Sequence, residues 1–342
     1  MILGIETSCD ETAAALLDAS GELRSNVIAS QRVHERYGGV VPEIASREHV
    51  KKLVPVIDQA LADAGVTLDH VSGIAVTSGP GLVGSLLVGL TTAKAMAAAR
   101  GLPLVGVNHL EGHVRSPFLE SAEFRVPAVV LVASGGHTLL VHVNETHDLE
   151  ILGRTRDDAA GEAYDKVSVL LGLGYPGGAA LEKLAKGGDP AAFAFPRSWL
   201  EDGTLDFSFS GLKTAVRFTL DRDPSLATGE RAADVAASFQ AAVIEVLVTR
   251  LVQAAERVGA GSVSVAGGVA ANRTLRAALE QECARRRLHL VVPRHEYCGD
   301  NAAMIAFAGK RRLDRGESDD LTLDAHPNLP LGDIPNRARG RK

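Results

Sequence analysis

The segment "NHLEGHVRSPF" carries two histidines, His109 and His113, at positions i and i+4. On a helix these positions share one face, so both imidazoles can bind the same metal ion. Glu111 lies between them, whereas the helical zinc-protease pattern His-Glu-x-x-His has its glutamate, the general base, directly after the first histidine. At ~100° per residue, Glu111 points roughly 200° away from His109. If the pair holds a metal ion, the spacing provides no peptidase base beside it and leaves the third ligand open.

One acid that could complete such a site is Asp300, in the segment "CGDNAAMIA". It follows a Pro-containing loop and precedes a predicted helix, where aspartate is a common N-cap. The same carboxylate would also complete a His-His-Asp metal site. The residues alone do not choose between the cap and the ligand.

A polar turn follows the apolar N-terminal run "ILGI". Its acids and hydroxyls are Glu6, Thr7, Ser8, Asp10, Glu11 and Thr12. Most are ordinary turn residues. Glu6 differs because it directly follows the apolar run, where a buried carboxylate needs a specific partner.

A second turn, "SGGH" at 134–137, offers backbone N–H groups and a hydroxyl with little side-chain bulk, which suits a phosphate or acyl oxygen. In "DDAAGEAYDK", Asp158, Glu162 and Asp165 fall at i, i+4 and i+7 of a predicted helix. This is either an exposed acidic stripe or a ligand-facing set, and composition favours neither. "GYPGG" at 174–178 predicts a tight turn with exposed backbone.

The elements that position these residues are strands and helices in alternation. "MILGIETSCDETAAALLD" and "PAVVLVASGGHTLLVHVN" both predict strand, polar turn, strand, which indicates two similar lobes. "AGSVSVAGGVAANRTLRAALEQECARR" predicts a strand, a Gly-Gly turn and a helix with Asn272 near its start, a natural phosphate site. Helices are expected at 46–64, 85–100, 160–171 and 234–258, so the class is α/β. Residues 187–231 are expected to be irregular.

One motif is misleading. "GPGLVG" at 79–84 matches G-x-G-x-x-G, but no Asp or Glu lies between Ser85 and Leu110 to bind a ribose. The position after Gly84 is Ser85, so the lysine of a P-loop is missing as well. We expect these glycines to allow a tight turn and close helix packing.

Composition bounds the class of protein. The 342 residues are 46% hydrophobic with net charge −6, which predicts folded domains and no global polycation. Three cysteines without close spacing, and an N-terminus without a signal peptide, predict a soluble cytoplasmic protein that binds no membrane. Local basic clusters at 285–287, 310–312 and in the tail 331–342 are solvated surface or a footprint for an anionic polymer.

Ten ordered segments together closely resemble the TsaD family of tRNA threonylcarbamoyltransferases. They are "GIETSCDET", "YGGVVPEIASREH", "GPGLVGSLLVG", "NHLEGH", "SGGHT", "DDAAGEAYDKV", "GYPGG", "DFSFSGLKT", "GGVAANRTLR" and "DNAAMIA", and they span residue 2 to about 310. The resemblance implies the actin, Hsp70 and sugar-kinase (ASKHA) fold, with two lobes around a nucleotide cleft. We expect an N-terminal lobe at 1–108 with about 305–330 packing back on it, and a C-terminal lobe at 109–304.

Site residues follow from the resemblance, position by position. The metal ligands match His109, His113 and Asp300. The substrate-binding positions match Val132, Ala133, Ser134, Gly135, Gly136, Asp165, Gly178 and Asn272. Thr7, Ser8 and Glu11 sit where the superfold places its phosphate-facing first turn, and Glu11 and His137 are weak catalytic candidates. A further polar contact of some relatives would fall near Glu182 and is left unassigned.

The implied reaction is transfer of threonylcarbamoyl from threonylcarbamoyl-AMP to N6 of adenosine 37 in tRNAs reading ANN codons, with AMP released. The implied cofactor is one divalent metal ion per subunit, Fe2+ ahead of Zn2+, with an adenine nucleotide or threonylcarbamoyl-AMP as ligand. Such a metal needs no water-activating glutamate beside it. The implied partners are tRNA, a TsaB-like paralogue, a TsaE-like P-loop ATPase and a TsaC-like synthase that supplies the adenylate.

Three other functions compete with this one. The first is a metal-dependent (glyco)peptidase, against which the position of Glu111 argues. The second is an ATP-dependent kinase or ATPase of the same superfold, in which Asp165 would face a hydroxyl and the paired histidines would be surplus. The third is a chaperone-like module, which a His109→Ala variant with unchanged folding and lost activity would exclude.

Overall fold

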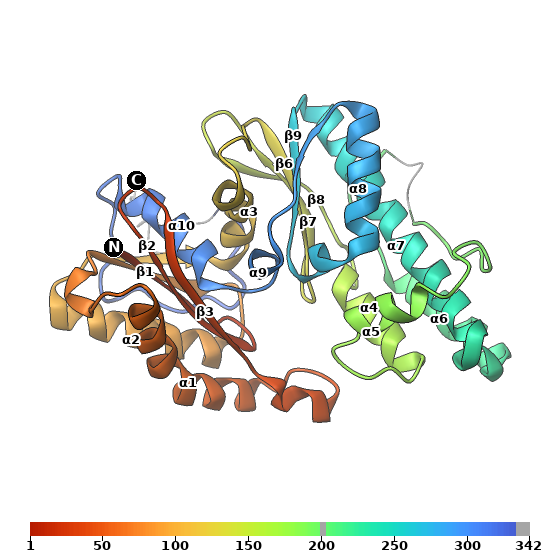
Figure 1. Ribbon diagram of the computed structural model, residues 1–342, viewed down its shortest axis with the longest axis horizontal. Helices are drawn as coiled ribbons and strands as arrows, with labels where there is room; N and C mark the ends of the chain where they lie inside the picture. The colour runs from red at the N-terminus through yellow and green to blue at the C-terminus, as the bar shows by residue number, and fades with distance from the viewer. Residues whose placement is uncertain (199–202, 333–342) are drawn as a thin grey trace, which may run out of the picture. The chain divides into compact units, whose positions relative to one another are not determined.

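The computed structural model describes residues 1–198 and 203–332 of the chain (Figure 1). The chain divides into two compact units: residues 1–119 together with the segment from Asp300 onward form unit 1, and residues 120–299 form unit 2. The lobes predicted from the sequence, 1–108 and 109–304, remain a prediction. The predicted basic tail, 331–342, falls outside the described residues from position 333 on.

Unit 1 is built on a five-stranded mixed sheet in the order β3-β2-β1-β4-β5. Strands β1 (Ile2–Glu6), β2 (Glu11–Leu17) and β3 (Leu23–Ser30) form an antiparallel meander. Strands β4 (Gly73–Gly79) and β5 (Leu104–Asn108) then continue the sheet parallel to β1. The helices are α1 (Pro42–Asp63), α2 (Val83–Arg100), α3 (His109–Glu120) and α10 (Ala302–Leu313), with short 3-10 turns at Arg32–Tyr37 and Leu68–His70.

The two faces of this sheet carry different helices (Figure 1). Side chains alternate along a strand, so Leu3 and Ile5 pack with apolar residues of α1 and α2. Ile2 lies on the opposite face, where it packs with Met304 and Ile305 of α10. By the same alternation, Glu6 at the end of β1 falls on the α10 face of the sheet.

Helix α10 approaches β1 more closely than any side chain would allow. A Cβ on Gly4 would lie 2.4 Å from the carbonyl oxygen of Ala302 and 2.7 Å from Cβ of Ala306. Only glycine therefore fits at this position of β1. The close packing fixes the first turn of α10, directly after Asp300, against the sheet.

A C-terminal segment, residues 314–330, runs back over the β4–β5 edge of the sheet, and we call it the strap. The N–H of Asp319 donates to the carbonyl of Leu104 (2.7 Å), and its carboxylate pairs with the buried guanidinium of Arg312 (3.0 Å). Further along, the side-chain amide of Asn108 donates to the carbonyls of Leu329 (3.3 Å) and Pro330 (2.9 Å). The strap is therefore hydrogen-bonded to the residue that precedes His109.

Unit 2 repeats the same sheet topology, in the order β10-β9-β6-β7-β8. Strands β6 (Ala128–Ala133), β7 (Thr138–Val143) and β8 (Leu149–Arg154) form the antiparallel meander. Strands β9 (Ser262–Ala266) and β10 (His289–Val291) add to β6 in parallel. The helices are α4 (Ala160–Leu170), α5 (Gly178–Ala185), α6 (Ser210–Arg222), α7 (Gly229–Val258), α8 (Arg273–Arg286) and α9 (His295–Cys298), with 3-10 turns at Pro224–Ala227 and Gly268–Ala271. The repeat confirms the two predicted strand–turn–strand units.

Helix α7 is the central helix of unit 2. It is long and apolar enough to cross a membrane by length and composition, but 83% of its most apolar window is buried within the protein. A core helix of a soluble protein gives the same signal. A second apolar stretch of the sequence, residues 81–107, folds as α2 followed by β5 and contains the helix expected at 85–100.

The structure corrects one prediction about the chain and bears out another. The segment 187–231 was expected to be irregular, and this is wrong for its second half, because α6 forms there. Its buried residues Leu212, Val216 and Leu220 recur every four positions, which is the periodicity of an amphipathic helix. The turn at 79–84 does serve close packing, since a Cβ on Gly84 would lie 2.4 Å from Oγ of Ser46 on α1.

Candidate metal centre

Helix α3 starts where β5 ends, and the join is fixed by one side chain. The amide oxygen of Asn108 accepts hydrogen bonds from the backbone N–H groups of Leu110 (2.9 Å) and Glu111 (3.3 Å), which otherwise lack helical partners. Its amide nitrogen is held by the strap. His109 therefore begins the helix at a position that both the sheet and the strap determine.

A glycine between the two histidines lets α3 approach α10. A Cβ on Gly112 would lie 2.9 Å from Cδ1 of Ile305 and 3.0 Å from Cγ of Met304. The close approach brings His113, on the same side of α3, to the loop that precedes α10. This is the local reason why Asp300, distant in sequence, meets the histidine pair.

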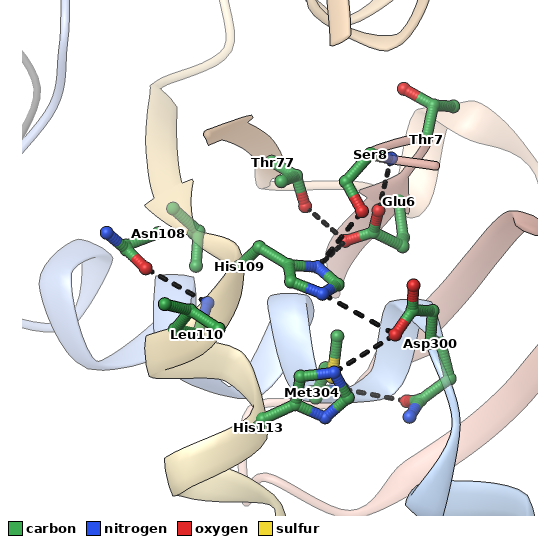
Figure 2. A network of polar contacts seen from close by, with 12 residues as sticks. Glu6, Thr7, Ser8, Thr77, Asn108, His109, Leu110, His113, Asp300 and Met304 are labelled. Carbon is green, nitrogen blue, oxygen red and sulfur yellow. Dashed lines mark hydrogen bonds and ion pairs between the residues drawn. The ribbon is translucent and has the colours of Figure 1, made fainter. Parts of the chain in front are cut away.

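The three predicted metal ligands converge on one point within unit 1 (Figure 2). Oδ1 of Asp300 lies 3.0 Å from Nε2 of His113 and 3.4 Å from Nε2 of His109. All three candidate ligand atoms lie within 4.8 Å of one another. Among residues 1–198 and 203–332, this is the only group of three or more His, Cys, Asp or Glu side chains close enough to hold one metal ion. Ligands about 2.1 Å from a tetrahedral ion would lie about 3.4 Å apart, so the residues fit one metal ion.

Glu111 takes no part in this cluster. Its carboxylate pairs with Arg115 one turn further along α3, at 3.4 Å. The sequence prediction that this glutamate points away from the histidine pair is confirmed. A His-Glu-x-x-His peptidase base is therefore not reproduced at this site.

Asp300 is not the N-cap of the helix that follows it. That role belongs to Asn301, whose side chain accepts from the N–H of Met304 at 3.0 Å. The cap interpretation of Asp300 is wrong because the helix begins one residue later than that reading requires. Its carboxylate is left directed at the two imidazoles.

The buried acid predicted to need a partner finds one in His109. Glu6 is fully buried, and its Oε2 lies 3.0 Å from Nδ1 of His109. The Thr77 hydroxyl donates to the same oxygen at 2.6 Å, and the N–H of Ser8 donates to Oε1 at 2.5 Å. Figure 2 shows these contacts on the side of the imidazole away from Asp300.

Charge at the site is shared between carboxylates and imidazoles. Burial alone would lower the pKa of His109, but the carboxylates of Asp300 and Glu6 raise it well above its ordinary value. Burial would raise the pKa of Asp300, yet the imidazoles of His109 and His113 hold it well below its usual range. The pKa of Glu6 is lowered by His109 in the same way, against the effect of burial. Two imidazoles facing one partly buried carboxylate form a donor set that suits a divalent cation.

The other residues of the first turn have distinct surroundings. The Thr7 hydroxyl donates to the backbone carbonyl of Ser85 at 2.9 Å, which ties the turn to α2. Burial, with the charges of Asp300 and Asp10, raises the pKa of Glu11 to about 10. Glu11 thus belongs to the acidic surroundings of Asp300, while its catalytic role remains a prediction.

Of the predicted substrate segment 132–136, Val132 and Ala133 are the last two residues of β6, and residues 134–136 lie in the turn that closes the β6–β7 hairpin of unit 2. The N–H of Ser134 donates to the carbonyl of His137 (2.8 Å), and the N–H of Gly161 donates to the carbonyl of Ser134 (3.1 Å). No described atom would meet a Cβ on Gly135 or Gly136, so the backbone of this turn is open to a ligand. The loop and the start of α4 are thus neighbours within unit 2.

Two of the remaining predicted substrate residues, Asp165 and Asn272, make structural contacts in unit 2. Asp165 accepts from the N–H of Gly177 at 2.7 Å, which holds the turn before Gly178 and α5. Asn272 caps α8 by accepting from the N–H of Leu275 at 2.9 Å, and its amide donates to Gln240 at 2.8 Å. Their substrate contacts remain a prediction.

Of the three acids expected at i, i+4 and i+7 of one helix, Asp158 lies before α4, and both it and Glu162 form ion pairs with lysines. Asp158 precedes α4 and pairs with Lys166 (3.0 Å) and Lys213 (2.7 Å), and Glu162 pairs with Lys166 (2.7 Å). Sequence reasoning missed these lysines as partners, although Lys166 lies four residues after Glu162, the spacing of a helical ion pair.

Most of the described side chains in the two basic clusters 285–287 and 310–312 form ion pairs with nearby carboxylates. Arg286 contacts both Glu282 and Glu256, and Arg285 contacts Glu282. In the second cluster, Lys310 pairs with Asp314 at 2.7 Å, while Arg312 is used by the strap. Neither cluster is an open row of cations.

A family model described as TsaD, tRNA N6-adenosine threonylcarbamoyltransferase, matches residues 22–307. Relatives bearing the name tRNA N6-adenosine threonylcarbamoyltransferase include one from Geobacter metallireducens, 53% identical over 98% of this chain and 99% of the relative. Another, from Moorella thermoacetica, is 54% identical over 96% of this chain and 97% of the relative. Each likeness extends over nearly the whole of this chain and of the relative.

Two solved structures share the fold at low sequence identity. HypF from T. kodakarensis has a TM-score of 0.62 at 15% identity, over 92% of this chain and 48% of that chain. The activator of the 2-hydroxyisocaproyl-CoA dehydratase from Clostridium difficile was solved with bound ADPNP. It has a TM-score of 0.53 at 13% identity, over 93% of this chain and 98% of that chain. They confirm the predicted α/β fold of the ASKHA type.

Proposed function

Because the chain belongs to the TsaD family of tRNA N6-adenosine threonylcarbamoyltransferases, we propose that His109, His113 and Asp300 hold the divalent metal ion at which this reaction takes place. The chain is a transferase that places a threonylcarbamoyl group on N6 of an adenosine in tRNA. The observation that carries the metal proposal is the convergence of two Nε2 atoms on Oδ1 of Asp300.

The proposed donor is threonylcarbamoyl-AMP and the proposed acceptor is adenosine 37 of tRNAs that read ANN codons. The exocyclic amine forms a C–N bond with the carbamoyl carbon, the C–O bond to the phosphate of AMP breaks, and the amine loses a proton. A bound metal ion would supply Lewis-acid stabilisation of the oxygen on which negative charge develops. The chain's own contribution at this point is to hold two imidazoles and one carboxylate in fixed positions.

We propose Fe2+ as the ion, because two histidines and one carboxylate are the ligand set of many Fe2+ sites, although the same set accepts Zn2+. The three ligands would leave coordination positions open for substrate oxygens. Metal analysis of the purified protein distinguishes the two ions directly.

We propose that the adenylate binds through unit 2, at the loop 132–136 and through Asp165, Gly178 and Asn272. The open backbone of Gly135 and Gly136 supports this, because free N–H groups stabilise phosphate and acyl oxygens. Asn272 sits at the N-terminus of α8, where the helix dipole favours an anion. His137 follows the loop and is kept as a weak candidate for proton handling.

An exposed apolar surface of unit 1 supports the proposal that the chain binds a TsaB-like partner. Val50 and Val54 on α1 are exposed by 67% and 57%, and Val83 and Leu87 on α2 by 52% and 43%. Each pair is spaced i, i+4, and α1 packs on α2 through Ser46 and Gly84. We call these four residues the apolar patch and propose that it contacts the paralogue, since exposed apolar residues gathered on adjacent helices mark interaction surfaces.

We further propose that a TsaE-like ATPase and a TsaC-like synthase complete the system in the cytoplasm. The test is reconstitution: this chain, its partners, the synthase, ATP, threonine, bicarbonate and an unmodified ANN-decoding tRNA are mixed, and the digested tRNA is examined by mass spectrometry. Threonylcarbamoyl-adenosine is expected with the wild type and with Glu111→Gln, and not with His113→Ala. Full product formation by a folded His113→Ala would overturn the metal proposal.

A further inference from the structure

We propose that Glu6 is a positioning residue for the metal site: its carboxylate fixes the His109 imidazole with the proton on Nδ1 and so presents the Nε2 lone pair to the ion. The inference rests on the metal site proposed above. It assigns a role to a buried acid that lies outside the ligand set, more than a hundred positions before His109 in the chain.

The first step is that the Glu6 carboxylate cannot turn. The Thr77 hydroxyl donates to Oε2 at 2.6 Å, and the N–H of Ser8 donates to Oε1 at 2.5 Å. The side chain is 0% exposed, so no solvent competes for either oxygen. Strand alternation explains the direction of the side chain, because Glu6 lies on the α10 face of the sheet with Ile2 and Gly4.

The second step concerns the tautomer of His109. A carboxylate oxygen accepts hydrogen bonds and does not donate them, so Nδ1, 3.0 Å from Oε2, carries the proton. A neutral imidazole with its proton on Nδ1 has its lone pair on Nε2. Nε2 is the atom that faces Oδ1 of Asp300 at 3.4 Å (Figure 2).

The third step is a contrast between the two histidines. Nδ1 of His113 is buried and has no hydrogen-bond partner within the described part of the chain. The two rings also stand nearly perpendicular, at 88° with centroids 4.8 Å apart, so they do not lock one another by stacking face to face. Glu6 therefore acts on His109 alone, and a change at Glu6 is expected to alter one of the two imidazole ligands.

Carboxylates bonded to the outer nitrogen of a metal-bound histidine typically contribute 10–100-fold to metal affinity. Glu6→Gln keeps the shape of the side chain but replaces one carboxylate oxygen, which accepts hydrogen bonds, with an N–H₂ group, which donates them. That group then faces a donor that the carboxylate now accepts from: the Ser8 N–H on one side, or the Thr77 hydroxyl and Nδ1 of His109 on the other. Ser8→Ala is the matched control, because the Ser8 hydroxyl is the other group near Nδ1 of His109, at 3.2 Å, and its loss leaves the carboxylate in place.

The experiment uses Co2+ as the probe, with the full-length protein. Affinity is measured by competition with a chelator, and the hyperfine-shifted exchangeable ring N–H signals of the Co2+ protein are recorded by proton NMR in water. For Glu6→Gln we expect affinity weaker by about 10–100-fold, with one of the two ring N–H signals lost or broadened by exchange and the other retained. For Ser8→Ala we expect wild-type affinity within about threefold and both signals.

Glu6→Gln with wild-type affinity and both signals unchanged would overturn the role of Glu6 while leaving the metal site intact. Wild-type protein that binds no Co2+, or His113→Ala that binds it normally, would overturn the proposed metal site and this inference together. If Glu6→Gln does not fold, Thr77→Val replaces it, since it removes the hydroxyl that holds Oε2. Wild-type affinity and unchanged ring N–H signals in Thr77→Val would then count against the inference.

Discussion

Nε2 of His113 lies 3.0 Å from Oδ1 of Asp300, although the two residues are 187 positions apart in the chain. The contact exists because α3 and α10 pack together through Gly112, and because the close approach at Gly4 holds the start of α10 on the sheet. Both histidines and the carboxylate belong to unit 1, so the proposed metal site is complete within one compact part of the protein.

Asn108 joins the metal-site helix to the strap, and its loss should loosen both. Asn108→Ala removes the cap of α3 and leaves the carbonyls of Leu329 and Pro330 without their donor, so we expect unfolding free energy to fall by about 1–3 kcal/mol. Urea unfolding measures this, and limited proteolysis should cut the strap faster. Asp314→Ala, at an exposed ion pair, should change stability by less than about 0.5 kcal/mol. Equal stability of the two variants would contradict the role of Asn108.

Gly4 should not accept even one methyl group. Its Cβ would collide with the carbonyl of Ala302, so we expect Gly4→Ala to destabilise the protein by about 1–3 kcal/mol and to weaken metal binding by displacing Asp300. The matched control is Gly211→Ala on α6, where a Cβ meets nothing within 4 Å and a gain of up to about 1 kcal/mol is expected. Thermal unfolding and metal titration of both variants check this. Unchanged metal affinity in Gly4→Ala would contradict the claim that the packing of α10 against Gly4 positions Asp300 for the metal ion.

Asp157 should make part of the stability depend on pH. Its carboxylate accepts from the hydroxyls of Ser208 (2.5 Å) and Ser210 (2.7 Å) and from the N–H of Phe209 (2.8 Å), which fixes the start of α6. Burial would raise the pKa of Asp157, but the hydrogen bonds from Ser208 and Ser210 lower it below its ordinary value. The contribution of Asp157 to the free energy of unfolding is therefore complete above its pKa of about 4 in the unfolded chain. This contribution is lost as the pH falls through its lower pKa in the folded protein.

We expect Asp157→Ala to lower the free energy of unfolding by about 1 kcal/mol at pH 7. This difference in unfolding free energy from the wild type should narrow only below about pH 4. Urea unfolding at pH 7 and pH 3 measures the gap. Asp221→Ala, which removes an exposed acid 4.0 Å from Arg217, should show little difference at either pH. A gap for Asp157→Ala that stays constant with pH would contradict the assignment.

The apolar patch gives a prediction about assembly. A charge at its centre, as in Val54→Glu or Leu87→Glu, should weaken the complex with the TsaB-like paralogue by at least tenfold, because the carboxylate would be desolvated in the contact. Isothermal titration or sedimentation of the mixture measures this affinity. Phe218→Glu, at an equally exposed apolar position of unit 2, is the control and should bind as the wild type does. Normal binding by both patch variants would place the contact elsewhere.

Local patterns predicted the elements of this chain well. The two strand–turn–strand units and the helices carry clear periodicities, and the observed α2 and α4 start within two residues of the expected positions. The i, i+4 spacing of His109 and His113 identified the histidine pair without any knowledge of the fold. Helix α6 was missed because the glycines and prolines around it outweighed its own apolar periodicity.

Long-range contacts could not be predicted in this way. Asp300 as third ligand came only through the family resemblance, since its local pattern fits a helix cap equally well. The burial of Glu6 after an apolar run indicated a missing partner, but its partners Thr77 and His109 come from two other strand ends of the same sheet. The C-terminal segment at about 305–330 was predicted to pack back on the N-terminal lobe 1–108. The hydrogen bonds of the strap to Asn108 depend on three-dimensional contacts that no local pattern records.

The most direct test of the metal site is an anomalous difference map from crystals of the protein loaded with Fe2+. One peak is predicted, within about 2.0–2.3 Å of Nε2 of His109, Nε2 of His113 and a carboxylate oxygen of Asp300. A peak ligated by other residues, or no peak at this point in a protein that binds iron, would contradict the account.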